Sequence, residues 1–269
     1  MAALIHAKTE GNPLFMVDLL RHLRDRQVLA QEQGRWVLAQ SLPDLQRELP
    51  ESVRSLIERK IARVGEEDRR VLVAASVQGY EFDAAVMAQA LARDPADVEE
   101  QLERLERVHA FVRLVGEQEF PDRTLTLRCR FVHVLYQNCL YASLQPTRRV
   151  SLSAAVARAL ERYHGEKSTA VAGELALLWE AARDFARAAD CYLEAAQNAA
   201  RLFANQEVIV LARRGLELLK SLPEAPERDQ LELKLEAIPR PGLDKLDGAR
   251  RNGCGTCFRP GARALSAGW

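Results

Sequence analysis

The feature that most constrains the fold is a series of helical patterns that fills the second half of the chain. After His133, apolar and small residues recur at helical spacing, and no alternating strand pattern interrupts them. Leu, Ala, Arg and Glu dominate the composition, as is typical of helical proteins. We therefore expect a mainly α-helical fold, with helices over 133–143, 147–164, 168–181, 184–202, 204–220 and 226–237.

Two of these segments place small residues where paired helices must approach closely. One contains Leu175-Ala176-Leu177-Leu178-Trp179, and the other contains Asp184-Phe185-Ala186-Arg187-Ala188-Ala189. This spacing resembles a tetratricopeptide repeat (TPR), in which pairs of helices stack side by side. The resemblance implies TPR-like helical repeats over residues 146–237. Because such arrays need about three repeats for stability, we expect this array to be incomplete.

Residues 51–145 combine several helical patterns with two alternating segments, Phe111–Val115 and Leu125–Phe131, which predict strands. Between the helices, residues 79–83 form a short extended link, and Asp83 is expected to cap the helix that follows. Helices followed by a two-stranded hairpin favour a winged-helix-like domain over this range.

The first 42 residues contain the turn Gly11-Asn12-Pro13, which breaks one helical pattern and starts another. Glycine permits the backbone to turn, and proline is preset for a first helical turn. An apolar helical pattern follows up to about Gln27, and residues 28–38 predict a short hairpin with Gly34 in its turn. We expect residues 1–42 to form the helices and hairpin of an incomplete module.

The motifs of nucleotide-hydrolysing proteins do not occur in the sequence. There is no G-x-x-x-x-G-K-[ST] phosphate loop, and no hydrophobic strand ends in acidic residues that could hold a metal. The sequence also lacks G-x-S-x-G, H-E-x-x-H and a Cys/His pair with an orienting acid. We therefore expect no catalytic residues and no enzyme activity from this chain alone.

The order of these parts resembles the C-terminal half of STAND-type signalling ATPases, which are AAA-related nucleotide switches. In that family a Gly-x-Pro turn opens a lid helix beside the adenine of the nucleotide, and a winged helix and helical repeats follow. Such modules occur with LuxR-type regulators, class III adenylate cyclases and serine/threonine kinases. The resemblance covers about residues 2–237 and implies the regulatory region of a signal-transduction ATPase whose phosphate-loop core lies upstream.

The resemblance implies nucleotide contacts for Gly11, Asn12 and Pro13 and for His133. In STAND proteins a histidine at the junction of the last wing strand and the next helix reaches the β-phosphate of ADP. Here Val134 stands where the plant Met-His-Asp motif has Asp, so the sequence departs from that pattern. The alternatives are a plain helix–helix turn at 11–13 and a structural histidine at 133. Without a core domain we expect no cofactor and no metal; an intact relative would bind ATP or ADP with Mg²⁺.

Charge and composition argue against nucleic-acid and membrane partners. Basic and acidic residues both number 38, and the would-be recognition helix, residues 97–107, carries five acids and two bases that would repel phosphate. No apolar run approaches the ~20 residues that span a bilayer, and we expect no signal peptide. Widely spaced cysteines such as Cys129 and Cys191 indicate a reducing compartment, and we expect a cytoplasmic location.

The composition changes after Ala237. Residues 238–269 hold six of the 14 glycines and show no helical period, so we expect a disordered tail. Coding sequence outside its native frame is the alternative. The C-x-x-C of Cys254 and Cys257 has no second ligand pair and no βαβ context, and we attribute it to chance.

Two functions from different classes remain after these exclusions. The first is the regulatory, sensing and protein-interaction region of a nucleotide switch, and the alternative is a TPR-type interaction scaffold with no nucleotide role. A winged-helix transcription factor is a third hypothesis, disfavoured by the acidic helix. Under the first hypothesis, Leu14, Phe15 and Val17 should lack a packing partner when the core domain is absent.

Overall fold

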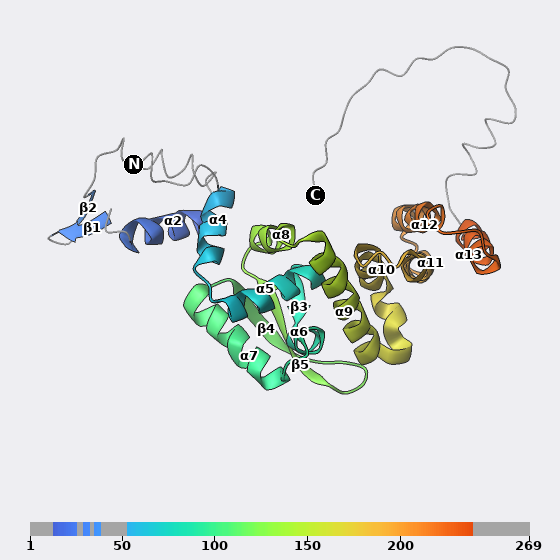
Figure 1. Cartoon of the computed structure of the whole chain (residues 1–269), viewed down its shortest axis with the longest axis horizontal. Helices are drawn as coiled ribbons and strands as arrows, with labels where there is room; N and C mark the ends of the chain where they lie inside the picture. The colour runs from blue at the N-terminus through green and yellow to red at the C-terminus, as the bar shows by residue number, and fades with distance from the viewer. Residues whose placement is uncertain (1–12, 26–28, 33–34, 39–52, 239–269) are drawn as a thin grey trace, which may run out of the picture.

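The computed structural model describes residues 13–25, 29–32, 35–38 and 53–238, and Figure 1 shows their arrangement. This part of the chain is mainly helical, which confirms the predicted fold class. None of its helices is long and apolar enough to cross a membrane. The expected tail, residues 238–269, lies outside the described residues except for Ile238.

The N-terminal part consists of one helix and a two-stranded hairpin. Helix α2 spans Pro13–Asp25, and strands β1 (Leu29–Glu32) and β2 (Arg35–Leu38) pair antiparallel. Proline stands at the first position of α2, where its missing N–H costs no helical hydrogen bond.

The middle part alternates helices with short strands. Its elements are α4 (Val53–Ala62), α5 (Glu66–Gln78), β3 (Glu81–Asp83), α6 (Ala84–Leu91), α7 (Pro95–Arg104), a π-helical turn (Leu105–His109), β4 (Val112–Glu119) and β5 (Leu125–Phe131). The strands form one antiparallel sheet in the order β3-β5-β4. The extended link predicted at 79–83 therefore supplies a third strand, because β5 offers it a partner edge.

Asp83 stands at the N-cap of α6, as the sequence predicts, but its side chain does not cap the helix. The Ala85 N–H donates instead to Oγ1 of Thr126 on β5, at 2.9 Å. The Asp83 carboxylate is engaged elsewhere, with Gln78 and Arg128. The sheet thus supplies the cap, and this frees the aspartate for a buried ion pair.

The last part is a run of helices, most of which pack against the next helix along the chain. Its elements are α8 (Val134–Ala142), α9 (Pro146–His164), a 3₁₀ segment (Gly165–Val171), α10 (Ala172–Ala181), α11 (Phe185–Arg201), α12 (Asn205–Leu219) and α13 (Pro226–Glu236). Gly215 on α12 lets the helices meet closely, because an added Cβ would lie 3.0 Å from Leu235 and 3.3 Å from Tyr192.

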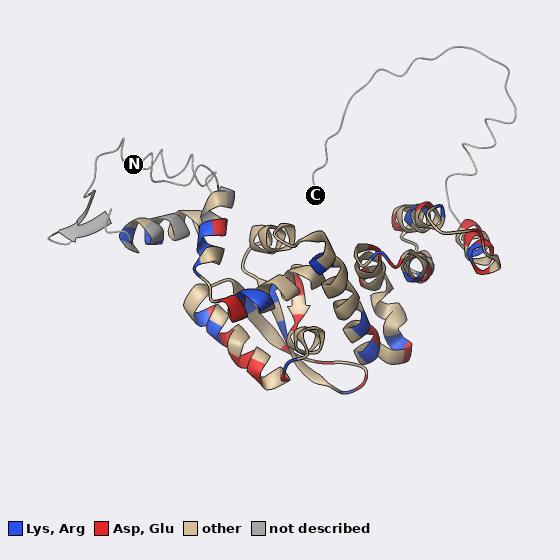
Figure 2. Ribbon diagram, viewed as in Figure 1, with Lys and Arg blue, Asp and Glu red and all other residues tan. Residues whose placement is uncertain are grey.

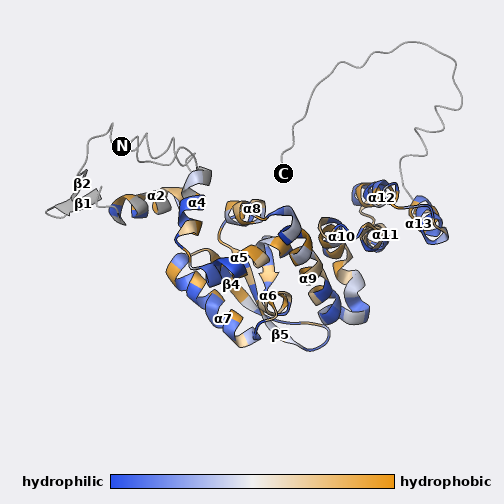
Figure 3. Cartoon of the chain, viewed as in Figure 1, coloured by the Kyte–Doolittle hydropathy of each residue, from blue (hydrophilic) through white to orange (hydrophobic). Residues whose placement is uncertain are grey.

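Two hydrophobic clusters stabilise the described part. The larger one runs from Phe15 and the middle part through α9 and α10 to Tyr192 and Leu218, and the smaller one joins α11, α12 and α13. Figure 3 shows hydrophobic positions recurring along α5, α6 and α9, which pack against one another in the larger cluster.

Candidate functional site

The structure places only part of the turn predicted to contact a nucleotide. Gly11 and Asn12 lie outside the described residues. Pro13 is exposed and begins α2, the helix that carries Phe15.

His133 lies between β5 and α8, at the N-cap of the helix. Its Nδ1 accepts a hydrogen bond from the Leu135 N–H at 3.2 Å. An imidazole nitrogen that accepts is unprotonated, so the neutral ring carries its proton on Nε2. His133 thus caps the first turn of α8 through its side chain.

Phe15 connects the two predicted segments. Its ring lies 5.1 Å from the His133 ring in an edge-to-face arrangement and 6.2 Å from the Tyr136 ring. Phe15 is 1% exposed, whereas Val17 is 46% exposed. The expectation that Phe15 lacks a packing partner is wrong, because the start of α8 supplies one. The side chain of Leu14 lies outside the described residues.

A lysine lies among the same aromatic rings. Lys60 of α4 donates to the Tyr136 hydroxyl at 3.0 Å, and its Nζ lies 5.0 Å and 4.9 Å from the ring centres of Phe111 and Tyr136. An ammonium over aromatic faces is attracted by their negative quadrupole, most strongly where water is excluded. No local sequence pattern signals these partners, because Tyr136 lies 76 residues from Lys60 along the chain. We name the set Phe15, Lys60, Phe111, His133 and Tyr136 the Phe15–His133 cluster.

The described cysteines do not form a reactive site. Cys129 is fully buried, as predicted, and burial raises the pKa values of the Cys129 and Cys191 thiols to about 12. Both stay protonated near neutral pH and are poor nucleophiles. Within the described ranges, no three His, Cys, Asp or Glu side chains come together in a way that could hold a metal ion.

A second group of polar residues lies where the middle part meets α10. Asp83 Oδ2 accepts from Gln78 Nε2 at 2.9 Å and from an Arg128 guanidinium nitrogen at 2.7 Å. Glu174 on α10 interacts with the same Gln78 side chain, and burial raises the pKa of the Glu174 carboxyl. We name these four residues the polar joint. Its chemistry is that of a structural network whose protonation affects how the two parts pack.

The raised pKa of Glu174 predicts a pH-dependent contribution to stability. Between the ordinary carboxyl pKa and the raised value, the folded state keeps a proton that the unfolded state has lost. Stability therefore falls as pH rises through this window. We expect Glu174→Gln, which cannot ionise, to raise the free energy of unfolding at pH 7 by roughly 1 kcal/mol and to remove this fall.

Thermal melts of both proteins from pH 4 to pH 8 measure this effect, with the exposed Glu166→Gln as the matched control. The same pH dependence in the wild type and Glu174→Gln would show that Glu174 titrates normally in the folded protein.

In comparisons with protein-family models, with curated proteins and with solved structures, no match to this chain was found. The function is therefore inferred from the arrangement of residues alone.

Proposed function

We propose that this chain is the regulatory region of a nucleotide-switched signal-transduction ATPase of the STAND type, and that it works with a separate phosphate-loop core. The observation that carries the proposal is the contact between Phe15 and His133. It joins the helix that begins at Pro13 to the histidine at the strand–helix junction. A nucleotide held between the core domain and this region would then meet both segments from one side.

The arrangement of elements supports the finer parts of the proposal. The middle part contains a helix, a short strand, two helices and a hairpin, with the sheet order β3-β5-β4, and this order supports the winged-helix assignment. The packing of α10 against α11 and of α12 against α13, with Gly215 at a close contact, supports the assignment of TPR-like repeats. In such a switch, exchange of ADP for ATP would release the winged helix from the core, and the repeats would bind a protein partner or effector domain in the cytoplasm.

The charge of α7 argues against a DNA-binding role for this winged helix. Its residues include Asp97, Glu99, Glu100 and Glu103, and Figure 2 shows acidic residues along the helix. A helix of this charge would repel the phosphates of a major groove. Salt-sensitive DNA binding by the purified chain would contradict this part of the proposal.

The proposal predicts nucleotide binding only when a core domain is present. Fluorescent ADP and ATP are titrated into the full chain alone, and into its mixture with the separately expressed phosphate-loop domain of a STAND protein. We expect binding in the mixture alone, and we expect His133→Ala to weaken ADP binding about tenfold through loss of one charge-assisted hydrogen bond. His109→Ala is the matched control and should bind as the wild type does.

Two outcomes would contradict this proposal. Mg²⁺-dependent ATP hydrolysis by the chain alone that survives His133→Ala would reveal an active site of its own. Absence of binding in the mixture, from folded protein, would favour the interaction scaffold without a nucleotide role. That alternative is supported by Leu202 and Phe203 at the turn between α11 and α12, which are 80% and 86% exposed.

A further inference from the structure

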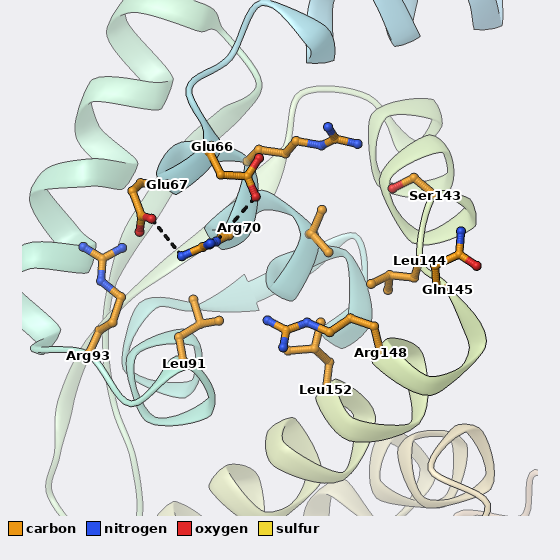
Figure 4. A pocket seen from close by; sticks show the side chains of 12 residues that line it. Glu66, Glu67, Arg70, Leu91, Arg93, Ser143, Leu144, Gln145, Arg148 and Leu152 are labelled. Atoms are coloured by element: carbon orange, nitrogen blue, oxygen red, sulfur yellow. Dashed lines mark hydrogen bonds and ion pairs between the residues drawn. The ribbon is translucent and has the colours of Figure 1, made fainter.

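An open groove lies between α5, the end of α6 and the segment that joins α8 to α9. Its volume is about 960 Å³, and Figure 4 shows the side chains that line it. Four arginines and two glutamates contribute to the lining, which leaves it a net charge of +2. We name it the arginine groove, after Arg69, Arg70, Arg93 and Arg148.

Two of the four arginines are occupied by residues of the groove or its border. Arg70 pairs with Glu66 at 3.5 Å and with Glu67 at 2.9 Å, as the dashed lines of Figure 4 show. Arg93 donates to Oε1 of Gln101 at 2.6 Å. Their donors are therefore partly satisfied within the protein.

Arg69 and Arg148 differ from these two. Neither side chain has a hydrogen bond or an ion pair with any other residue in the part of the chain that the structure describes. Arg69 is half-buried on α5, and Arg148 is exposed in the first turn of α9. A guanidinium presents its donors in a fixed fork that matches a carboxylate, so each arginine could bind one acidic side chain.

Four of the six remaining lining residues are apolar, and the other two are Ser143 and Gln145. Leu144 and Leu152 are buried, and Val73 and Leu91 are half-buried, so together they supply a hydrophobic surface below the arginines. A free phosphate would gain nothing from this surface and would be repelled by Glu66 and Glu67. A peptide segment can place an apolar side chain on the surface and direct its carboxylates to Arg69 and Arg148.

We propose that the arginine groove binds an acidic segment of a partner protein in which an apolar side chain is flanked by Asp or Glu. Charge complementarity with Arg69 and Arg148 selects the carboxylates, and the leucines select the apolar residue. The groove is built by α5, the end of α6, the segment between α8 and α9, and α9 itself, whereas the Phe15–His133 cluster lies at the start of α8 and against α2 and α4. This proposal therefore does not depend on nucleotide binding.

Fluorescence anisotropy with the full chain and a labelled peptide of alternating Glu and Leu tests the proposal. Two control peptides replace every Glu with Gln, or every Leu with Ser. We expect the Glu–Leu peptide to bind about tenfold more tightly than either control, and its affinity to fall when NaCl is raised. Equal affinity for the Gln peptide would overturn the proposal.

Charge reversal locates the binding site. Arg69→Glu combined with Arg148→Glu should weaken binding of the Glu–Leu peptide at least tenfold. The matched control combines Arg113→Glu with Arg158→Glu, two exposed arginines outside the groove, and changes the net charge equally. The same loss in both double variants would show a non-specific charge effect and would overturn the proposal.

Arg148→Glu alone covers the case in which the double variant does not fold. Arg148 lies in the first turn of α9, where a negative charge is favourable to the helix, so this variant should fold. It should weaken binding several-fold. Inorganic phosphate and ADP are added as competitors, and displacement of the peptide by either at low millimolar concentration would instead assign the groove to a phosphate ligand.

Discussion

Trp179→Ala is expected to lower the free energy of unfolding by about 3–5 kcal/mol, the largest effect that the structure predicts. Trp179 is 2% exposed and connects three helices. Its Nε1 donates to Oε1 of Glu161 on α9 at 2.8 Å, and the Arg187 guanidinium of α11 lies 4.6 Å from its ring centre. Removal of the indole leaves a cavity between α9, α10 and α11 and also breaks both contacts.

Urea unfolding followed by circular dichroism measures this effect without relying on tryptophan fluorescence. Leu177→Ala, on the same helix but 63% exposed, is the control and should change stability by less than about 0.5 kcal/mol. Trp179→Phe keeps part of the ring volume but loses the hydrogen bond, so an intermediate loss of about 1–2 kcal/mol is expected. A loss below about 1 kcal/mol for Trp179→Ala would mean that the Trp179 side chain does not hold α9, α10 and α11 together.

The sequence predicts the helices of the second half well because their apolar periodicity is local. The prediction for 226–237 differs from α13 by one residue, and that for 184–202 differs from α11 by one residue at each end. The predicted helix at 168–181 is only partly correct, since α10 begins at Ala172 after a 3₁₀ segment. There Asn198 of α11 donates its side-chain amide to the Thr169 carbonyl at 2.6 Å, a distant contact that periodicity does not reveal.

The candidate sites depend on contacts between residues far apart in the chain. His133 can be singled out from the sequence because it follows a strand pattern and precedes a helical one. Its contact with Phe15 cannot be predicted in this way, because 117 residues separate the two. Both residues also lie in apolar patterns that could pack against several different segments. The arginine groove is hidden for the same reason: Arg69 and Arg148 look like solvated surface residues until α5 and α9 are packed together.

Strand β3 shows a further limit of local patterns. Three residues are too few to establish an alternating pattern, and Glu81–Asp83 becomes a strand only through pairing with Arg128–Arg130 of β5. Several helix ends likewise use the left-handed conformation at non-glycine residues, for example Ala92 and Ala110. No glycine signals these ends, because the packing of the neighbouring helices and strands selects the conformation.

Asp83→Ala is expected to lower the free energy of unfolding by about 2–4 kcal/mol, the second largest effect. The aspartate is 1% exposed, and its loss leaves the Gln78 amide and the Arg128 guanidinium without their acceptor. Arg128 retains Glu81 at 3.3 Å, which compensates part of the charge and keeps the expected loss below that of Trp179→Ala. Glu81→Ala is the control: this carboxylate is 46% exposed, so its pair should contribute at most about 1 kcal/mol.

The dependence of stability on salt and pH distinguishes the contribution of the Asp83–Arg128 ion pair from that of packing. The Asp83–Arg128 pair is partly shielded from water, so the loss in Asp83→Ala should change little between 0.1 and 1 M NaCl, on the order of a few tenths of a kcal/mol. Asp83 also helps to raise the Glu174 pKa through its charge. In Asp83→Ala, the decrease in stability with rising pH that Glu174 causes should therefore be smaller. The same substitution also removes the hydrogen bond between the Asp83 carboxylate and Gln78.

Asp83→Asn keeps the shape and one acceptor oxygen, and we expect it to lose about half as much stability as Asp83→Ala. Equal losses in the two variants would assign the whole effect to the charge, whereas no loss in either would show that the polar joint does not hold α10 against the middle part.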